Sequence, residues 1–201
     1  MIRVLLAEDQ AMVRGALAGL LSLEPDIEVV AQVARGDEVL DAALSARPDV
    51  ALLDIEMPGI DGLQAAGLLR AELPECKVLI LTTFGRPGYL RRAMEQGAAG
   101  FLLKDAPSEE LARAIRRATR GERVVDPGLA AAALSEGPSP LTPREHDVLA
   151  AARQYATVSD IASALHLSAG TVRNYLSAAI GKTGARNRNE AIRAAEEKGW
   201  L

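Results

Sequence analysis

The sequence predicts two domains, an α/β domain built on a parallel sheet followed by a small all-α domain. Three observations lead to this fold class. Short apolar runs alternate with helical patterns over about the first 120 residues, which is typical of a parallel sheet covered on both faces. Gly-Pro-Ser-Pro at 137–140 then reads as a linker, and the residues after it show only helical patterns. The predicted boundaries are 1–122, 123–140 and 141–201.

Five strands are predicted where runs rich in leucine and β-branched residues are too short to be helices. They are residues 4–7, 27–31, 50–54, 77–82 and 100–103. Joined through helices, these strands form a doubly wound sheet of the flavodoxin-like type.

Each intervening helix has its own signal. The first carries an apolar stripe at helical spacing, made of Met12, Val13, Ala16, Leu17, Leu20 and Leu21. The second is predicted at 37–46, and the third follows Asp61. The fourth begins at Pro87, a residue favoured in the first helical turn, and the fifth runs from Pro107 to a stop at Gly121.

Two helix starts are recognisable in the second domain. Thr142-Pro143-Arg144-Glu145 has the form of a capping box, with proline at the first helical position. Residues 160–176 read as helix, short turn, helix, with Ser168 as the N-cap of the second helix. Leu167 and Val172 have the spacing of a hydrophobic staple.

Composition limits the function classes. The single cysteine, Cys76, allows neither an internal disulfide nor a cysteine metal cluster. No apolar run approaches membrane-spanning length, and the run at the start is too short for a signal peptide, so we expect a soluble cytoplasmic protein without direct membrane insertion. The net charge of −4 divides into −6 before residue 139 and +2 from there on, which favours different partners for the two domains.

Polar residues end four of the five predicted strands. They are Glu8, Asp9, Asp54, Thr82 and Lys104. In a parallel sheet these ends lie at one edge, so the side chains are expected to converge. Crowded carboxylates favour a cation among them, and oxygen ligands of this kind suit Mg²⁺. A carboxylate there could attack a phosphoryl group whose oxygens the threonine and lysine hold. Scattered solvated acids are the alternative, and the completeness of the set argues against it.

The same residues, with Leu-Asp-Ile-Glu-Met-Pro-Gly-Ile-Asp-Gly at 53–62, resemble the receiver domain of bacterial response regulators. The resemblance implies that Asp54 accepts a phosphoryl group from a sensor histidine kinase. It further implies a role for each residue of the set. Those roles are Mg²⁺ binding by Glu8, Asp9, Asp54 and the backbone carbonyl of Glu56, phosphoryl contact by Thr82 and Lys104, and an inward-turning aromatic switch at Phe101, where tyrosine is common.

Stretches at 7–10, 80–89 and 104–111 are further similar to the subgroup that regulates a membrane-lipid desaturase pathway. That similarity implies a membrane-bound, DesK-like histidine kinase as partner.

The helix that starts after Ser168 has two faces. Val172, Leu176, Ala179 and Ile180 are apolar, whereas Arg173, Asn174 and Ser177 lie opposite. The polar face suits base edges in a major groove, with arginine toward guanine and asparagine toward adenine. The residues expected to meet phosphates are Thr171, Tyr175, Lys182, Arg186 and Arg188. A helical bundle that binds protein, with a merely solvated face, is the alternative from spacing alone.

Residues 141–195 resemble the LuxR-type helix-turn-helix of NarL/FixJ regulators, which implies binding to double-stranded promoter DNA. One position departs from that family. Tyr155 stands where a glycine is often found, so a helix end usually made with glycine must be made in another way.

We therefore predict a two-component transcriptional regulator that is phosphorylated on Asp54, forms a homodimer and binds promoter DNA. The first and fifth helices are the expected dimer interface, by analogy with the subgroup. Two alternatives stay open. One is a Mg²⁺-dependent aspartyl phosphohydrolase, although its Asp-x-Asp-x-Thr motif on the first strand is not matched. The other is an atypical receiver that regulates without phosphorylation.

Overall fold

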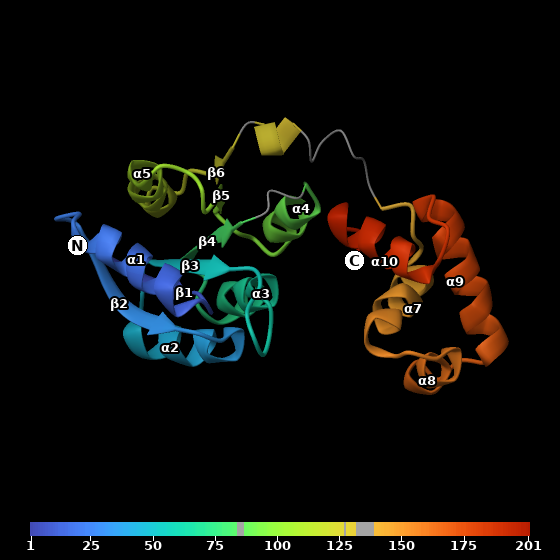
Figure 1. The fold of residues 1–201 in the computed structure, drawn as a ribbon. Coiled ribbons are helices and arrows are strands. Elements are labelled where there is room, and N and C mark those ends of the chain that lie inside the picture. The colour runs from blue at the N-terminus through green and yellow to red at the C-terminus, as the bar shows by residue number, and fades with distance from the viewer. Residues whose placement is uncertain (84–86, 127, 132–138) are drawn as a thin grey trace. The chain divides into compact units, whose positions relative to one another are not determined.

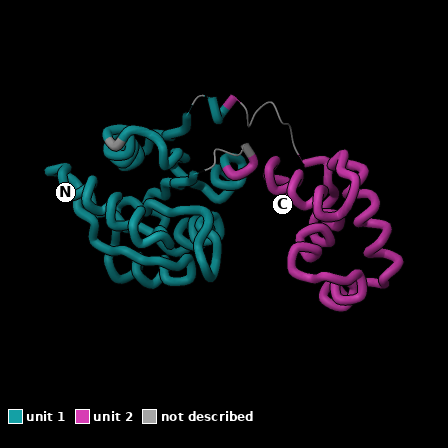
Figure 2. The backbone as a smooth tube through the Cα atoms, viewed as in Figure 1, with its two compact units in different colours: residues 1–85, 90–130 teal, residues 86–89, 131–201 magenta. Residues whose placement is uncertain are grey.

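The structure is a computed structural model that describes residues 1–83, 87–126, 128–131 and 139–201. The chain divides into two units, residues 1–85 with 90–130 and residues 86–89 with 131–201 (Figure 2). Residues 127 and 132–138 of the predicted linker lie outside the described part. No helix among the described residues is both long and apolar enough to cross a membrane.

A parallel sheet forms the centre of the first unit, with the described strands in the order β2-β1-β3-β4-β5-β6 (Figure 1). They are β1 (Ile2–Ala7), β2 (Ile27–Val33), β3 (Val50–Asp54), β4 (Lys77–Thr82), β5 (Gly100–Leu103) and β6 (Val124–Val125). The parallel, doubly wound prediction is confirmed, but the predicted number of five strands is wrong. β6 lies in the predicted linker and pairs with β5 through only two residues, too few to show a period.

Helices cover both faces of this sheet because neighbouring strand residues point to opposite sides. Leu6, Leu52 and Leu81 face the side where Leu21 of α1 and Ile115 of α5 are buried. α2 contacts β2 and β1, and α3 contacts β3 and β4. The helical segments are α1 (Ala11–Ser22), the 3-10 turn η1 (Gly36–Glu38), α2 (Val39–Ala46), α3 (Gly62–Glu72), α4 (Pro87–Glu95) and α5 (Ser108–Thr119). The helix predicted at 37–46 is therefore a 3-10 turn that leads into a shorter α-helix.

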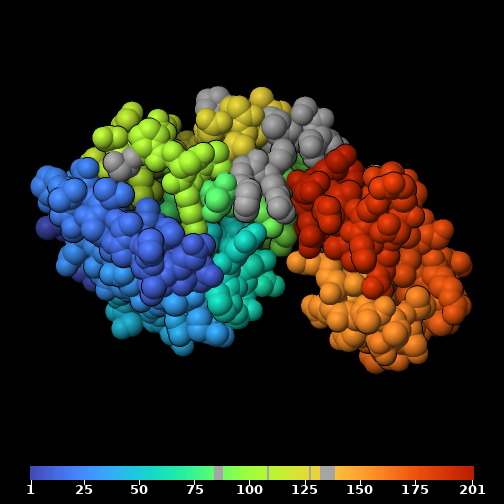
Figure 3. Space-filling view, viewed as in Figure 1, coloured from blue at the N-terminus to red at the C-terminus, as the bar shows by residue number. Residues whose placement is uncertain are grey.

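The apolar stripe of α1 is only partly buried. Leu21 is buried and Leu17 packs beside it, whereas Met12 is 87% exposed and Leu20 is 42% exposed. The space-filling view shows α1, in blue, at the surface of its unit (Figure 3). The stripe predicts the helix correctly, but half of it faces away from the core.

The second unit contains four described helices of at least seven residues. They are α7 (Pro143–Gln154), α8 (Val158–Ala164), α9 (Ala169–Thr183) and α10 (Arg188–Glu197). Their shared core includes Leu149, Ile161 and Val172, and Trp200 is buried in it. The predicted capping box at Thr142 and the predicted N-cap at Ser168 are both present.

Candidate functional site

Asp54 is held at the end of the most deeply buried strand. All five residues of β3 are buried, and Asp54 itself is only 5% exposed. The loop after it turns sharply because Gly59 adopts a left-handed backbone with φ of 85°. Gly62 then lies so close to the Asp54 carbonyl oxygen that an added Cβ would collide with it. The two glycines of the Pro-Gly-Ile-Asp-Gly stretch are therefore needed for the loop to turn and to pack beside Asp54.

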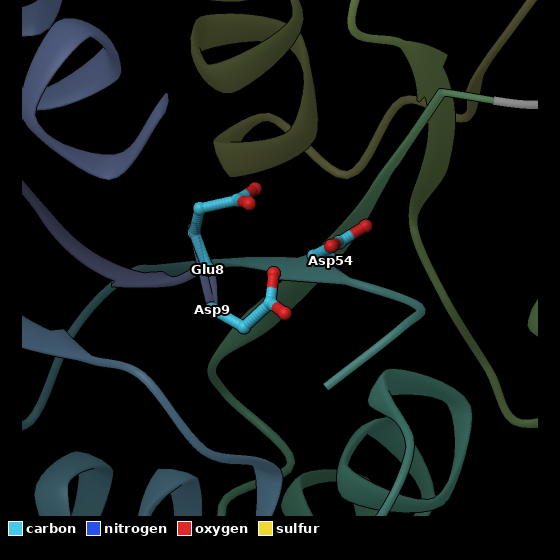
Figure 4. A group of neighbouring side chains, drawn as sticks. All are labelled: Glu8, Asp9 and Asp54. Carbon is cyan, nitrogen blue, oxygen red and sulfur yellow. The ribbon is translucent and has the colours of Figure 1, made fainter. Parts of the chain in front are cut away.

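Three carboxylates converge at the carboxyl edge of the sheet, as the sequence predicts (Figure 4). Glu8 and Asp9 follow β1 and Asp54 ends β3, and one ligand atom from each lies within 4.8 Å of the others. Their environments differ, since Glu8 and Asp54 are buried and Asp9 is exposed. Oxygen atoms grouped in this way match the ligand preference of Mg²⁺.

Lys104 forms ion pairs with both buried acids. Its Nζ lies 2.6 Å from Oε2 of Glu8 and 3.0 Å from Oδ2 of Asp54, and its side chain is 11% exposed. Its backbone N–H donates to the carbonyl oxygen of Thr82 at 2.9 Å, which fixes the residue beside the end of β4. The lysine therefore joins the ends of β1, β3 and β4.

Burial and charge compete in setting the proton affinities of this group. Burial raises the pKa of Asp54, and the hydrogen bond and charge of Lys104 only partly oppose it. Burial alone would lower the pKa of Lys104, but its hydrogen bonds to Glu8 and Asp54 outweigh that effect and raise it. Lys104 is consequently held in its charged form.

A polar cavity of about 60 Å³ opens beside Asp54. Its lining residues are Asp9, Gln10, Asp54, Glu56, Thr82 and Thr83. Glu8 is not among them, because its carboxylate lies with Lys104 instead. Sequence reasoning missed Gln10 and Thr83, although each directly follows a predicted site residue. The donors fit Mg²⁺, which Asp9, Asp54 and the backbone of Glu56 would hold from the side of the cavity.

Phe101 is already inside the protein. It lies on β5 opposite Ile80 of β4 and is 1% exposed. The inward position expected of the switch residue is therefore the one it occupies in this structure.

α9 presents the predicted polar face to solvent. Arg173, Asn174 and Ser177 are exposed, whereas Val172 and Leu176 are buried against the rest of the unit. Ser168 begins the helix by accepting a hydrogen bond from the N–H of Thr171 at 3.0 Å. Thr171 and Tyr175 are half-buried beside this face.

The three cations predicted to meet phosphates all have partners within the unit. Lys182 Nζ lies 2.6 Å from Oε2 of the buried Glu145, and Arg186 pairs with Glu190 at 2.8 Å. Arg188 donates to the carbonyl oxygens of Ala156 at 2.9 Å and Tyr155 at 3.4 Å. These contacts join residues up to 37 positions apart, so no local pattern could have revealed the longest of them.

A parallel sheet whose carboxyl edge carries acids, a lysine and a threonine, in a chain that also has a helix-turn-helix, defines a DNA-binding response regulator. The comparisons agree. Residues 4–116 match the family described as response regulator receiver domain, and residues 139–195 match bacterial regulatory proteins of the luxR family. The chain therefore belongs to the response regulators with a LuxR-type DNA-binding domain, the NarL/FixJ group.

Two relatives from Bacillus subtilis (strain 168) align over the full length of both chains. The chain is 49% identical to the uncharacterized transcriptional regulatory protein YvfU and 48% identical to the transcriptional regulatory protein DesR. A crystal structure of the response regulator ChrA, from a heme-sensing two-component system, is 34% identical. Its TM-score is 0.59, and the match covers 100% of this chain and 98% of ChrA.

Proposed function

We propose that Asp54 is the phosphoryl acceptor of this transcriptional regulator and that a sensor histidine kinase is the donor. An Asp54 carboxylate oxygen attacks the phosphorus of the kinase phosphohistidine. The new O–P bond forms as the N–P bond breaks and the imidazole leaves. The observation that carries the proposal is that Asp54, Asp9 and Thr82 line one polar cavity. The ammonium of Lys104 forms an ion pair with Asp54 at 3.0 Å.

The residues around Asp54 would then respond to the added charge. Phosphorylation adds nearly two negative charges and three acceptor oxygens. Lys104 is already 3.0 Å from the acceptor carboxylate, so exchanging that contact for a phosphoryl oxygen needs only a short movement. Bound Mg²⁺ would neutralise charge on the transferred group. Thr82, at the cavity wall, would contact another phosphoryl oxygen.

The proposed consequence is a homodimer formed through α1 and α5. Met12 and Leu23 are 87% and 78% exposed, so the first helix and its end offer uncovered apolar surface. α5 contributes arginines on its outer side, among them Arg113 and Arg117. Two paired helix-turn-helix units could then read two half-sites on promoter DNA.

For DNA we propose that Arg173, Asn174 and Ser177 contact base edges in the major groove. Thr171, Tyr175, Lys182 and Arg186 would contact phosphates. Action on promoter DNA implies a location in the cytoplasm. A membrane-bound, DesK-like kinase is the proposed partner because this chain is 48% identical to DesR over its full length.

The test is intact mass after incubation with acetyl phosphate and Mg²⁺, for the wild type and for Asp54→Asn. Uptake of one phosphoryl group by the wild type alone is the expected result. Size-exclusion chromatography of the same samples should show a dimer only for the phosphorylated wild type. Uptake by both proteins would exclude Asp54 as the acceptor, and uptake by neither would favour an atypical receiver.

The rival function is an aspartyl phosphohydrolase, which the same carboxylate cluster could serve. It predicts continuous turnover of a small phosphate ester such as p-nitrophenyl phosphate, dependent on Asp54 and Mg²⁺. The regulator predicts a single phosphoryl transfer to the protein and no such turnover.

A further inference from the structure

The C-terminal end of α7 is unusual for a helix that precedes a tight turn. Helices commonly end in a left-handed residue, mostly glycine, whose backbone N–H satisfies a free carbonyl oxygen. Here α7 ends at Gln154, and Tyr155 follows with extended backbone angles of −109° and 128°. The N–H of Tyr155 still donates to Ala151, but its own carbonyl oxygen points out of the helix. This end of the helix therefore has carbonyl groups that need another donor.

Arg188 donates to carbonyl groups of the turn that follows α7, from a distant part of the same unit. Its Nη1 donates to the carbonyl oxygen of Ala156 at 2.9 Å and approaches that of Tyr155 at 3.4 Å. The C-terminal end of a helix carries a partial negative charge, so a guanidinium there is favourable. Arg188 is itself half-buried, in contrast with Arg186, whose side chain is 88% exposed.

The position of Arg188 on its own helix points the same way. It is the first residue of α10, where the partial positive charge of the helix end disfavours a cation. Asn187, the N-cap, already accepts the N–H of Glu190 and so makes the helix start without help from the arginine. The hydrogen bonds of Arg188 are those with the turn after α7.

The turn that Arg188 contacts leads into the helix-turn-helix. Ala156 is followed by Thr157, whose hydroxyl accepts the N–H of Asp160 and begins α8. α8 packs against α9 through Ile161 and Val172, both fully buried in one cluster. Fixing residues 155 and 156 therefore fixes where α8, and with it the reading helix α9, can lie.

We propose that Arg188 is a positioning residue that holds the turn after α7, where Tyr155 stands in place of the usual glycine, and not the phosphate contact expected from the sequence. This inference takes from the proposed function only that the second unit binds DNA. Arg188 acts through the α7–α8 turn. Its loss should therefore lower the stability of the helix-turn-helix unit without removing a positive charge from the DNA interface.

The experiment compares Arg188→Gln with Arg186→Gln in the full chain. Trp200 is the only tryptophan and is buried in the core of the second unit, so its fluorescence reports the melting of that unit. Salt dependence is measured on a random-sequence duplex of about 40 base pairs, because each phosphate contact contributes about 0.9 to the slope of log K against log salt. Arg186→Gln, the same change two residues away, calibrates the loss of one exposed cation.

Arg188→Gln is expected to lower the melting temperature by about 4–8 °C, as a lost helix-end interaction does in a domain of this size. Its salt slope should equal that of the wild type. A slope smaller by about 0.9, or an unchanged melting temperature, would overturn the proposal. The melting experiment needs no DNA, so failure of the wild type to bind the duplex would contradict the proposed function alone.

A double-mutant cycle tests whether Arg188 and Tyr155 act on the same turn. Tyr155→Gly allows a left-handed helix end, so it should lower the melting temperature less in the Arg188→Gln background than in the wild type. Strictly additive shifts would show that Arg188 acts independently of the turn at residue 155 and would overturn the proposal.

Discussion

Removing the Lys104 ammonium should leave two buried carboxylates facing each other. Lys104→Met keeps an apolar stem of similar length but loses the contacts of 2.6 Å to Glu8 and 3.0 Å to Asp54. With an effective dielectric constant of about 20, these attractions amount to about 6 and 5.5 kcal/mol before desolvation is counted. Desolvation of the lysine opposes these attractions. The free energy of unfolding should therefore fall by about 3–5 kcal/mol, which is typical when one partner of a buried ion pair is removed.

The pH dependence gives this prediction a distinctive sign. Without the lysine, repulsion between Glu8 and Asp54 raises the pKa of at least one carboxyl above its unfolded value. Stability from such a group is present at low pH and is lost as the pH rises through the folded pKa. The cost of Lys104→Met should therefore be larger at pH 7 than at pH 5.

The assay is urea unfolding of the full chain at pH 5 and pH 7, followed by far-UV circular dichroism and by Trp200 fluorescence. The circular dichroism transition of the first unit should shift, while the fluorescence transition should stay in place. Lys77→Met, at the opposite end of the sheet on β4, is the matched control and should change stability by less than about 0.5 kcal/mol. A loss below about 1 kcal/mol at pH 7, or an equal loss at both pH values, would refute the reasoning.

Three further outcomes are expected. Burial raises the pKa of Asp54, so its stabilising contribution is present below its unfolded pKa and lost as the pH rises through the folded one. Asp54→Asn should thus raise the urea midpoint of the first unit at pH 7, and an unchanged or lower midpoint would contradict this. Gly181 lies inside α9 with open space around it, so Gly181→Ala should stabilise the second unit by about 0.5–1 kcal/mol in Trp200 fluorescence, and destabilisation would argue against it. Burial raises the pKa of Cys76 to about 11, so a thiol reagent at pH 8 should label it only when urea unfolds the first unit. Rapid labelling of the folded protein would show that the thiol is accessible.

Predictions from the sequence were most accurate where burial is continuous. The bounds of β3 agree with the prediction because all five of its residues are buried, and the first four form an uninterrupted apolar run that ends at Asp54. β6 has no such signal, since two valines become a strand only when the edge of β5 is available for pairing. The stripe of α1 shows the opposite limit, because helical spacing identifies apolar residues and does not say which of them, such as Met12, remain uncovered.

The sequence predicts which strand-end residues come together at the candidate site, but not which of them form ion pairs. The ends of parallel strands bring Asp9, Asp54 and Thr82 to one cavity, and topology alone is sufficient for that. Lys104 pairs with both Glu8 and Asp54, but only Asp54 also lines the cavity, and the spacing of residues in the sequence does not distinguish these two positions. In the second unit, the partners of Lys182 and Arg188 come from α7 and the turn after it, over separations that local patterns do not report.

The complete burial of β3 also determines which parts of the first unit can move when a group is added at its end. The strand lies between β1 and β4, and the hydrogen bonds of its backbone are shielded on both sides. Its amide protons are expected to exchange with deuterium only when the whole unit opens, on the slowest timescale the fold allows. A strand that keeps all its backbone hydrogen bonds is not expected to change conformation when a charge is added at Asp54. Under the proposed phosphorylation of Asp54, the displacement is expected in the surrounding loops, while β3 stays in place.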